Sequence, residues 1–379
     1  MKITNIRPYV LEAALSQPFA NSQAWNDKRM ALIIEIETDD GLVGWGESYG
    51  PAWMIAAAVK HVTPWLIGRD PLPTEKLWHE VYCRVRGHGR KGVVMDALSG
   101  IDIALWDIKG KHFGVPAYRL MGGPFRDTVQ AYATGLYRFK SGDPVDYLAA
   151  EAAGYVAEGF KAVKLKIGFG IEADVRAVRA VRRAIGDDIA LMVDANQAYD
   201  AVSAIRLGRM IEEYGIGWFE EPLPPDDLAG HLAVKAALSI PLAGGECEFT
   251  RFGFHDLLTA HALDVLQPDT CAAGGLTECK KIADMAGAFG TRFSPHCWGT
   301  GIAMAASLQL LAVLPPHTSP SLVVPPAEPM LEFDRTEHAI RRAVLTEPFE
   351  HSGGIVRLPE GPGLGIEIDR AALARFAAR

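Results

Sequence analysis

The stretch K-A-V-K-L-K-I-G, Lys161–Gly168, decides the fold when it is read together with the residues that follow it. It is a short apolar strand in which Lys164 and Lys166, two residues apart, point to the same face. A helical pattern follows, ends at Gly186 and leads into a second apolar strand, A-L-M-V-D (190–194). Apolar strands that alternate with helices are typical of a parallel sheet covered by helices.

This unit of strand and helix recurs along most of the chain. Eight such strands predict an α/β fold of the TIM-barrel type, whose chemistry lies at the C-terminal ends of the strands. An open doubly wound sheet is the alternative, but no G-x-G-x-x-G motif follows the first strand. The predicted strands are Q-A-Y-A-T-G (130–135), K-A-V-K-L-K (161–166), A-L-M-V-D (190–194), G-W-F-E (217–220), P-L-A-G-G-E (241–246), D-V-L-Q-P-D (264–269), T-R-F-S-P-H (291–296) and S-L-V-V (321–324).

The segments on either side of the predicted barrel have different patterns. Strand patterns on both sides of the turn D-D-G-L predict a hairpin with Gly41 at its turn, and S-G-I-D-I-A-L-W-D-I-K-G-K (99–111) predicts an amphipathic helix that ends near Gly114. The last fifty or so residues resemble loop and hairpin more than another barrel unit. We therefore predict three parts: an N-terminal α+β domain (1–125), a barrel (126–325) and a C-terminal segment that returns to the N-terminal domain (326–379).

Composition and charge narrow the class of protein. With 379 residues, 49% of them apolar, the chain can bury a large core. A formal net charge of −8 and the absence of a basic stripe argue against nucleic-acid binding. The longest apolar run is too short and too interrupted to span a membrane. Five cysteines without a C-x-x-C pair fit free thiols in a reducing compartment, so we expect a cytoplasmic protein.

A polar residue ends almost every predicted barrel strand. Counted from Lys166, the successive spacings are 28, 26, 26, 23 and 27 residues, close to one unit of strand and helix each time. Because each unit brings the chain back to the same rim of the barrel, these residues are predicted to form one cluster. They are Lys164 and Lys166, Asp194, Glu220, Glu246, Asp269 and His296.

Three of these residues are carboxylates. Asp194, Glu220 and Glu246 would repel one another or take up protons if they were buried together without a cation. An all-oxygen set of ligands favours Mg²⁺, or Mn²⁺ in its place. Glu221 points elsewhere by strand alternation, and we select Glu220 because its spacings to Asp194 and to Glu246 are equal. Asn196, in D-A-N, is close enough to reach the ion or the substrate, although a local turn bond explains it equally well.

The remaining polar residues suggest acid and base chemistry. Lys164 is a neighbouring cation that lowers the pKa of Lys166 and so makes it a candidate base, while Lys164 itself offers a fixed charge to a carboxylate. Asp269 is positioned to orient His296 and raise its basicity. The arrangement predicts removal of a proton α to a carboxylate, with the metal and Lys164 stabilising the resulting enediolate, a site pattern known for enolase-superfamily chemistry. Schiff-base formation on a lysine is the alternative, but it leaves the three acids unexplained.

At this point the sequence resembles the enolase superfamily, mandelate racemase subgroup, over essentially its whole length. The motifs that carry the resemblance are S-G-I-D-I-A-L-W-D-I-K-G-K, K-L-K, D-A-N, W-F-E-E-P, G-G-E, Q-P-D and P-H-C-W-G-T-G. The resemblance implies a modified (β/α)7β barrel under an α+β capping domain completed by the C-terminal segment, and it implies the same metal ligands, base and dyad. It also implies that Glu332 contacts the enediolate. The sequence around Glu332, taken without the resemblance, predicts a surface residue. A dimer or octamer is implied as well.

Within this subgroup the resemblance favours lactone cycloisomerases of the galactarate and glucuronate kind. The lysine that dipeptide epimerases use at the sixth strand is absent, because Asp269 occupies its place. Acid-sugar dehydratases and racemases of 2-hydroxy acids are the alternatives, and a non-catalytic binding protein would be expected to have lost a ligand or a base. The predicted substrate is a small carboxylate, and the residues predicted to bind it are Asn196, Asn21 and Gln23 of the capping loop, and Trp298.

Overall fold

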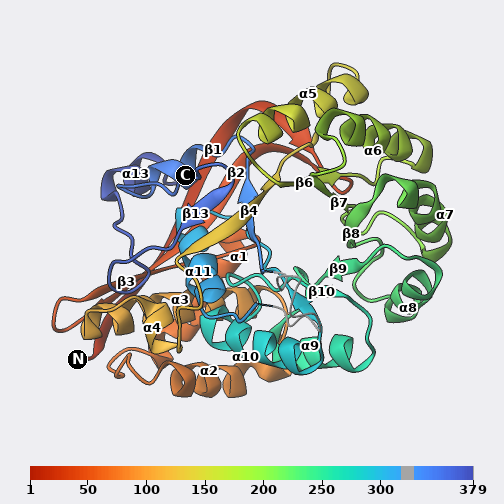
Figure 1. Cartoon of the computed structure of the whole chain (residues 1–379). Helices are drawn as coiled ribbons and strands as arrows, with labels where there is room; N and C mark the ends of the chain where they lie inside the picture. The colour runs from red at the N-terminus through yellow and green to blue at the C-terminus, as the bar shows by residue number, and fades with distance from the viewer. Residues whose placement is uncertain (317–327, 379) are drawn as a thin grey trace.

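The carboxyl-terminal two thirds of the chain form a barrel of parallel strands wrapped by helices (Figure 1). The structure is a computed structural model that describes residues 1–316 and 328–378. In the described part, neighbouring barrel strands follow the order β11-β10-β9-β8-β7-β6-β4-β12. The strands are β4 (Thr128–Thr134), β6 (Ala162–Lys166), β7 (Ala190–Asp194), β8 (Ile216–Glu220), β9 (Leu242–Gly244), β10 (Val265–Leu266), β11 (Arg292–Phe293) and β12 (Leu331–Asp334).

One long helix follows each barrel strand except the last, so the described residues form the expected modified (β/α)7β barrel. Seven of the predicted strands are confirmed. The eighth prediction, S-L-V-V (321–324), lies outside the described residues, and β12 is the strand that lies parallel to β4. The helices are α5 (Pro144–Ala157), α6 (Ile171–Ile185), α7 (Ala201–Ile211), α8 (Leu228–Ala237), α9 (Thr250–Thr259), α10 (Gly275–Ala288) and α11 (Gly301–Ala312).

The N-terminal part is an antiparallel sheet with helices on one face. Its strands follow the order β3-β2-β1-β5, and Gly41 has the positive φ of +87° that the predicted hairpin turn requires. The strands are β1 (Ile3–Ala20), β2 (Trp25–Thr38), β3 (Val43–Ser48) and the short β5 (Arg138–Phe139). The helices are α1 (Ala52–Val62), α2 (Thr74–Gly89), α3 (Val93–Phe113) and the short α4 (Ala117–Leu120).

Helix α3 joins the sheet to the barrel. It ends before Gly114, as predicted, and Gly114 adopts a left-handed conformation. The sequence suggested an amphipathic helix, but α3 is buried along most of its length because it packs between β3 and α10. The approach to β3 is close: a Cβ added at Gly46 would lie 1.9 Å from the carbonyl oxygen of Gly100. The glycines of V-G-W-G-E are therefore required by packing.

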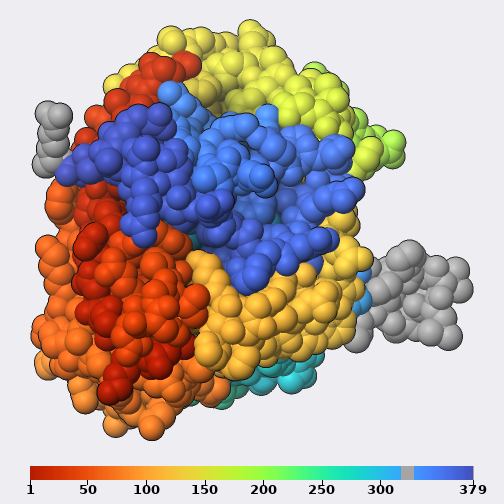
Figure 2. Space-filling view, turned by 90° about the vertical axis from the view of Figure 1, so that its left-hand side faces the viewer, coloured from red at the N-terminus to blue at the C-terminus, as the bar shows by residue number. Residues whose placement is uncertain are grey.

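The C-terminal segment packs on both parts (Figure 2). Strand β13 (Ile355–Arg357) pairs with β4, and the backbone of Ala378 donates to the carbonyl of Val10 in β1. Two short helices, α12 (Ala339–Ala343) and α13 (Arg370–Arg375), complete the segment. This agrees with a segment that completes both the barrel rim and the cap, while the exact divisions after residues 125 and 325 stay predictions.

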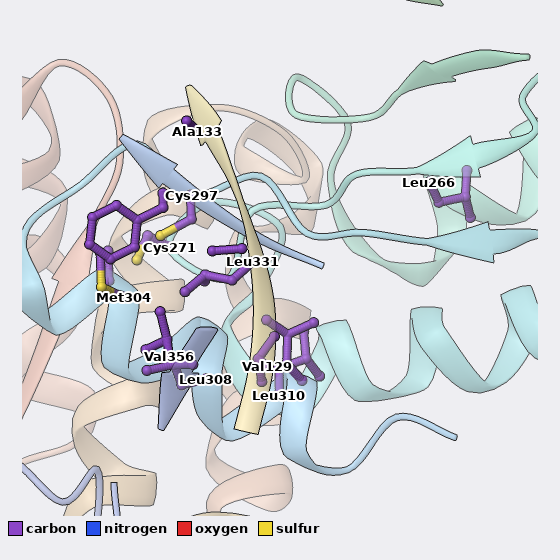
Figure 3. Packing of buried hydrophobic residues seen from close by; sticks show 14 of the residues in the cluster. Val129, Ala133, Leu266, Cys271, Cys297, Met304, Leu308, Leu310, Leu331 and Val356 are labelled. Carbon is purple, nitrogen blue, oxygen red and sulfur yellow. The ribbon is translucent and has the colours of Figure 1, made fainter. Parts of the chain in front are cut away.

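A continuous apolar core fills the space between β4, β12, β13 and α11 (Figure 3). Val129 on β4, Leu331 on β12, Val356 on β13 and Leu308 on α11 are all buried there. Burial of each such side chain stabilises the fold by about 1.5–3 kcal/mol. In the described residues, no helix is both long enough and apolar enough to cross a membrane.

Candidate active site

The lysine pair of K-L-K lies at the C-terminal end of β6, inside the barrel. Lys164 is fully buried and Lys166 is 5% exposed. Lys164 Nζ lies 2.5 Å from Glu220 Oε1 and 2.8 Å from Glu332 Oε1. The ammonium of Lys166 donates to the carboxylate of Asp194, which is opposite it on β7. Each lysine therefore offsets negative charge at the ends of other barrel strands: Lys166 that of β7, and Lys164 that of β8 and β12.

The three predicted metal ligands gather beside the lysines. One carboxylate oxygen from each of Asp194, Glu220 and Glu246 lies within 4.8 Å of the other two. Glu221 is not in this group, since it forms a separate one with Glu246 and Cys247. The last residues of β7 and β8 and the residue two positions after β9 thus supply the set that the regular spacing predicted.

This carboxylate set fits a divalent cation. Burial raises the pKa of Glu220 to about 7, and Asp194 adds to the rise, although Lys164 opposes it. Such crowding of acids is relieved by a hard cation, and carboxylate oxygens are the ligands that Mg²⁺ prefers. Beside the set, the buried amide oxygen of Asn196 has no hydrogen-bond partner among the described residues, while its backbone N–H donates to Asp194.

His296 and Asp269 form the predicted pair. His296 lies in the loop after β11, and Asp269 lies in the loop after β10. His296 Nδ1 lies 2.6 Å from Asp269 Oδ2, and His296 Nε2 lies 3.5 Å from Glu246 Oε2. Burial alone would lower the pKa of His296, but Glu246, Glu332 and Asp269 raise it to about 10. The free Nε2 therefore faces the carboxylate cluster while Asp269 fixes the ring.

The pKa of Lys166 differs from the expected direction. Burial has the largest effect and lowers this pKa, and Lys164 lowers it as well, but Asp194, Tyr137 and Glu246 together raise it above the usual value. The expected effect of Lys164 is present but smaller than that of the carboxylate. A cation held by Asp194 would offset the charge responsible for this rise.

Glu332 is buried, contrary to what the residue alone suggested. It is 1% exposed on β12, where it accepts hydrogen bonds from Thr134 Oγ1 at 2.7 Å and from the backbone of Cys297 at 3.1 Å. Burial would raise the pKa of Glu332, but Lys164 and His296 lower it to about 2. Glu332 thus links Lys164 to the loop that carries His296.

Two of the residues predicted to bind substrate, Asn21 and Gln23, lie in the capping loop between β1 and β2. The side chain of Asn21 accepts from the backbone of Gln23 and Ala24 within its own loop, and Gln23 Nε2 donates to the backbone oxygen of Asn196. In this structure both side-chain amides hold the capping loop in place. Their contact with substrate stays a prediction.

Trp298 lies in an aromatic cluster over the site. Its ring stacks with Tyr137 at a centroid distance of 6.3 Å and meets Tyr49 edge-on at 6.4 Å. The guanidinium of Arg29 lies 3.8 Å from the centroid of its ring. Trp298 Nε1 is buried and has no hydrogen-bond partner among the described residues.

Three further residues of the site were missed by the sequence reasoning. Gln267 donates to Glu220 at 2.8 Å, and its spacing of two from Asp269, the same as in K-L-K, could have found it. The ring centroid of Tyr137 lies 5.3 Å from Lys166 Nζ, a contact with no signal in the sequence. Glu47, from the N-terminal sheet, accepts hydrogen bonds from Thr300 and so holds the start of α11.

The chain is similar to known proteins over nearly its whole length. Residues 6–122 match the family model for the mandelate racemase / muconate lactonizing enzyme N-terminal domain, and residues 147–372 match the enolase C-terminal domain-like model. The D-galactarolactone cycloisomerase of Agrobacterium fabrum is 50% identical over 376 residues, 99% of each chain. The arabinonate dehydratase of Saccharolobus solfataricus is 36% identical, over 90% of this chain and 93% of that one.

A solved structure agrees with these sequence relatives. The 3,6-anhydro-D-galactonate cycloisomerase of Zobellia galactanivorans superposes with a TM-score of 0.91 and 41% identity over 100% of both chains. The two family models match 6–122 and 147–372, and each of the three relatives is covered over at least 93% of its own chain. The chain is therefore an enzyme of the enolase superfamily, in its mandelate racemase and muconate lactonizing enzyme family.

Proposed function

We propose that the enzyme is a cycloisomerase that opens the lactone of an acid sugar, of the galactarolactone kind. The observation that carries the proposal is the pair of candidate bases on either side of the carboxylate cluster. Lys166 contacts Asp194, and His296 Nε2 lies 3.5 Å from Glu246, so each base faces a different ligand of the set. A substrate carboxylate held at the cluster would have its α-carbon between the two bases.

The residues of this chain take part in only a few steps of the proposed reaction. Lys166 or His296 removes the proton α to the free carboxylate, and the bond from the β-carbon to the lactone oxygen breaks. The lactone oxygen leaves as a new carboxylate, the ring opens, and the resulting enol takes up a proton at the β-carbon to give a 2-keto acid. Lys164 contributes fixed positive charge, and Asp269 keeps the His296 ring oriented.

A divalent cation belongs to this proposal. Asp194, Glu220 and Glu246 would hold Mg²⁺, or Mn²⁺, with Asn196 nearby. When bound, the cation supplies positive charge next to the substrate carboxylate and so makes its α-proton more acidic.

Dehydration of an open acid sugar is the second candidate. It uses the same groups with a β-hydroxide as leaving group, and the match to an arabinonate dehydratase supports it. The test is a screen of aldarolactones and aldonates with Mg²⁺, followed by ¹H NMR in D₂O. Formation of a 2-keto acid from a lactone alone supports the cycloisomerase. Product from open acids alone supports the dehydratase, and deuterium exchange without any keto product would refute both.

A further inference from the structure

Glu220, one of the predicted metal ligands, accepts hydrogen bonds from three buried side chains. Lys164 Nζ lies 2.5 Å from its Oε1, while Trp218 Nε1 and Gln267 Nε2 both donate to its Oε2, at 2.9 and 2.8 Å. An ionised carboxylate has about four acceptor positions, two on each oxygen. Among the described residues, the two donors on Oε2 therefore fill that oxygen, and Lys164 leaves one position open on Oε1.

The side chain of Gln267 reaches Glu220 past a neighbouring strand. Glu220 ends β8 and Gln267 follows β10, and β9 lies between these two strands (Figure 1). Adjacent strands are about 4.8 Å apart, so roughly 10 Å separates β8 from β10 and only long side chains can meet. The β9 residue beside Glu220 is Ala243, whose methyl group leaves space for the contact. The backbone N–H of Gln267 donates to Gly244, the last residue of β9, and this bond fixes the base of the side chain.

The amide of Gln267 can face Glu220 in one orientation only. A carboxylate accepts hydrogen bonds, so the NH₂ group must point to it and the carbonyl oxygen must point away. That oxygen, Gln267 Oε1, is buried without a hydrogen-bond partner among the described residues. A buried acceptor without a partner destabilises a fold, and an apolar side chain would avoid this loss. The contact with Glu220 therefore explains a glutamine at this position better than packing does.

The filled oxygen restricts how Glu220 can bind a cation. Because no acceptor position is left on Oε2, the carboxylate can offer Oε1 but not both oxygens at once. Ca²⁺ binds carboxylates through one or two oxygens and accepts a larger number of ligands in flexible geometry, whereas the smaller Mg²⁺ requires nearly ideal octahedral geometry. A carboxylate that is held in place and limited to one oxygen therefore favours Mg²⁺.

We propose, on the basis of the cation in the proposed function, that Gln267 and Trp218 are positioning residues that make the carboxylate cluster selective for Mg²⁺ over Ca²⁺. Both act through Glu220, whose Oε2 they hold. Loss of either donor frees an acceptor position on Oε2 and allows the carboxylate to turn or to bind through both oxygens. Mg²⁺ then loses a fixed ligand, whereas Ca²⁺ can use the freed oxygen.

The test is calorimetric titration of the full chain with MgCl₂ and, separately, with CaCl₂, after bound metal has been removed on a chelating resin. We expect the wild type to bind Mg²⁺ more tightly than Ca²⁺. Gln267→Met keeps the length of the side chain but removes the donor. It should weaken Mg²⁺ binding by about tenfold or more and Ca²⁺ binding by less than about threefold, since loss of a residue that hydrogen-bonds a metal ligand typically costs roughly 10- to 100-fold in affinity. Trp218→Phe removes the other donor, keeps an aromatic ring and should lower the same ratio of affinities.

Two matched controls make the same chemical changes away from the cluster. Gln309→Met alters a buried glutamine whose amide bonds the backbone of Tyr118 and Leu364. Trp106→Phe removes a hydrogen bond to Thr277. The controls lose hydrogen bonds and some stability, which the melting temperature reports, but their affinities for Mg²⁺ and Ca²⁺ should equal those of the wild type.

The ratio of the two affinities separates a positioning role from a structural one. Equal losses for both ions in Gln267→Met and Trp218→Phe would make these residues part of the framework only and would overturn the proposal. So would unchanged affinities in both variants, a lower ratio in the controls, or a wild type that prefers Ca²⁺. A wild type that binds neither ion would refute the cation of the proposed function as well, whereas an unchanged ratio with normal Mg²⁺ binding would leave that function intact.

Discussion

The substitution Asp269→Asn tests how the catalytic histidine is held. Asp269 serves two donors with separate oxygens: Oδ2 lies 2.6 Å from His296 Nδ1, and Oδ1 accepts from the backbone of Cys271 at 2.6 Å. Asparagine has only one acceptor oxygen. Whichever way its amide is turned, one of the two buried donors then faces an NH₂ group.

The expected loss follows from these two contacts. One of the two buried donors loses its acceptor, and the loss of a hydrogen bond to a charged group costs about 1.5–3 kcal/mol. At roughly 1.36 kcal/mol for each factor of ten, this predicts a fall in kcat/KM of about 10 to 10². The loss of the Asp269 charge also lowers the pKa of His296 from its value of about 10, so the limb of the pH profile that belongs to His296 moves to lower pH.

The assay is kcat/KM measured by NMR at saturating Mg²⁺ on a substrate found in the screen, across a range of pH. The same substitution is then made in His296→Asn. If Asp269 acts only through His296, the second substitution costs less than about threefold in that background. Activity of Asp269→Asn within threefold of the wild type would refute the reasoning. So would a full, additive loss in the double variant, because it would give Asp269 a role independent of the ring.

Three other predictions follow from the site and its surroundings. Lys166→Met should reduce turnover by a factor of about 10² to 10⁴, because one proton-transfer group is lost. The Mg²⁺ affinity of this variant, measured by calorimetry, should change less than tenfold. Loss of metal binding would instead show that Lys166 has a structural role. Glu220→Gln should weaken Mg²⁺ binding a hundredfold or more in the same calorimetric titration, whereas the adjacent Glu221→Gln should change it less than tenfold. If Glu221→Gln weakens binding more than Glu220→Gln does, the metal is held instead by Glu221, Glu246 and Cys247. Burial and Asp269 raise the pKa of Asp96 from 3.8 to about 8. Between pH 4 and 8 the native state therefore holds a proton that the unfolded state releases. The free energy of unfolding falls over this range by up to about 1.4 kcal/mol per pH unit. Asp96→Asn should therefore raise the melting temperature at pH 8 and make little difference near pH 4; an equal shift at both pH values would contradict the assignment.

The barrel and most of its site could be predicted because both repeat along the chain. Strand alternation gives the face on which Lys164 and Lys166 lie, and the repeat of strand and helix returns Asp194 and Glu220 to the same rim. The observed register, with Lys166 beside Asp194 and Asp194 beside Glu220, is the arrangement that equal spacing implies.

The position of the eighth strand and the contact between the N-terminal sheet and α11 could not be predicted in this way. The strand parallel to β4 is Leu331–Asp334, and it brings Glu332 within 2.8 Å of Lys164 across a long separation in the sequence. Glu47 is similar: it lies in the N-terminal sheet and caps α11, which begins more than two hundred residues later. No periodic pattern links residues so far apart.

The sequence by itself determined the class of fold, the carboxylate set and the identity of the candidate bases, because local periodicity decides which side chains share a face and where each strand ends. The tertiary structure decided which charges meet. It paired Lys166 with Asp194, which raises the pKa of Lys166 where the lysine pair alone suggested a fall. It also left Arg138 buried with two donors that have no hydrogen-bond partner in the described part of the chain. Both results depend on the distances between side chains from distant strands and loops, and electrostatic and hydrogen-bond energies change steeply with those distances.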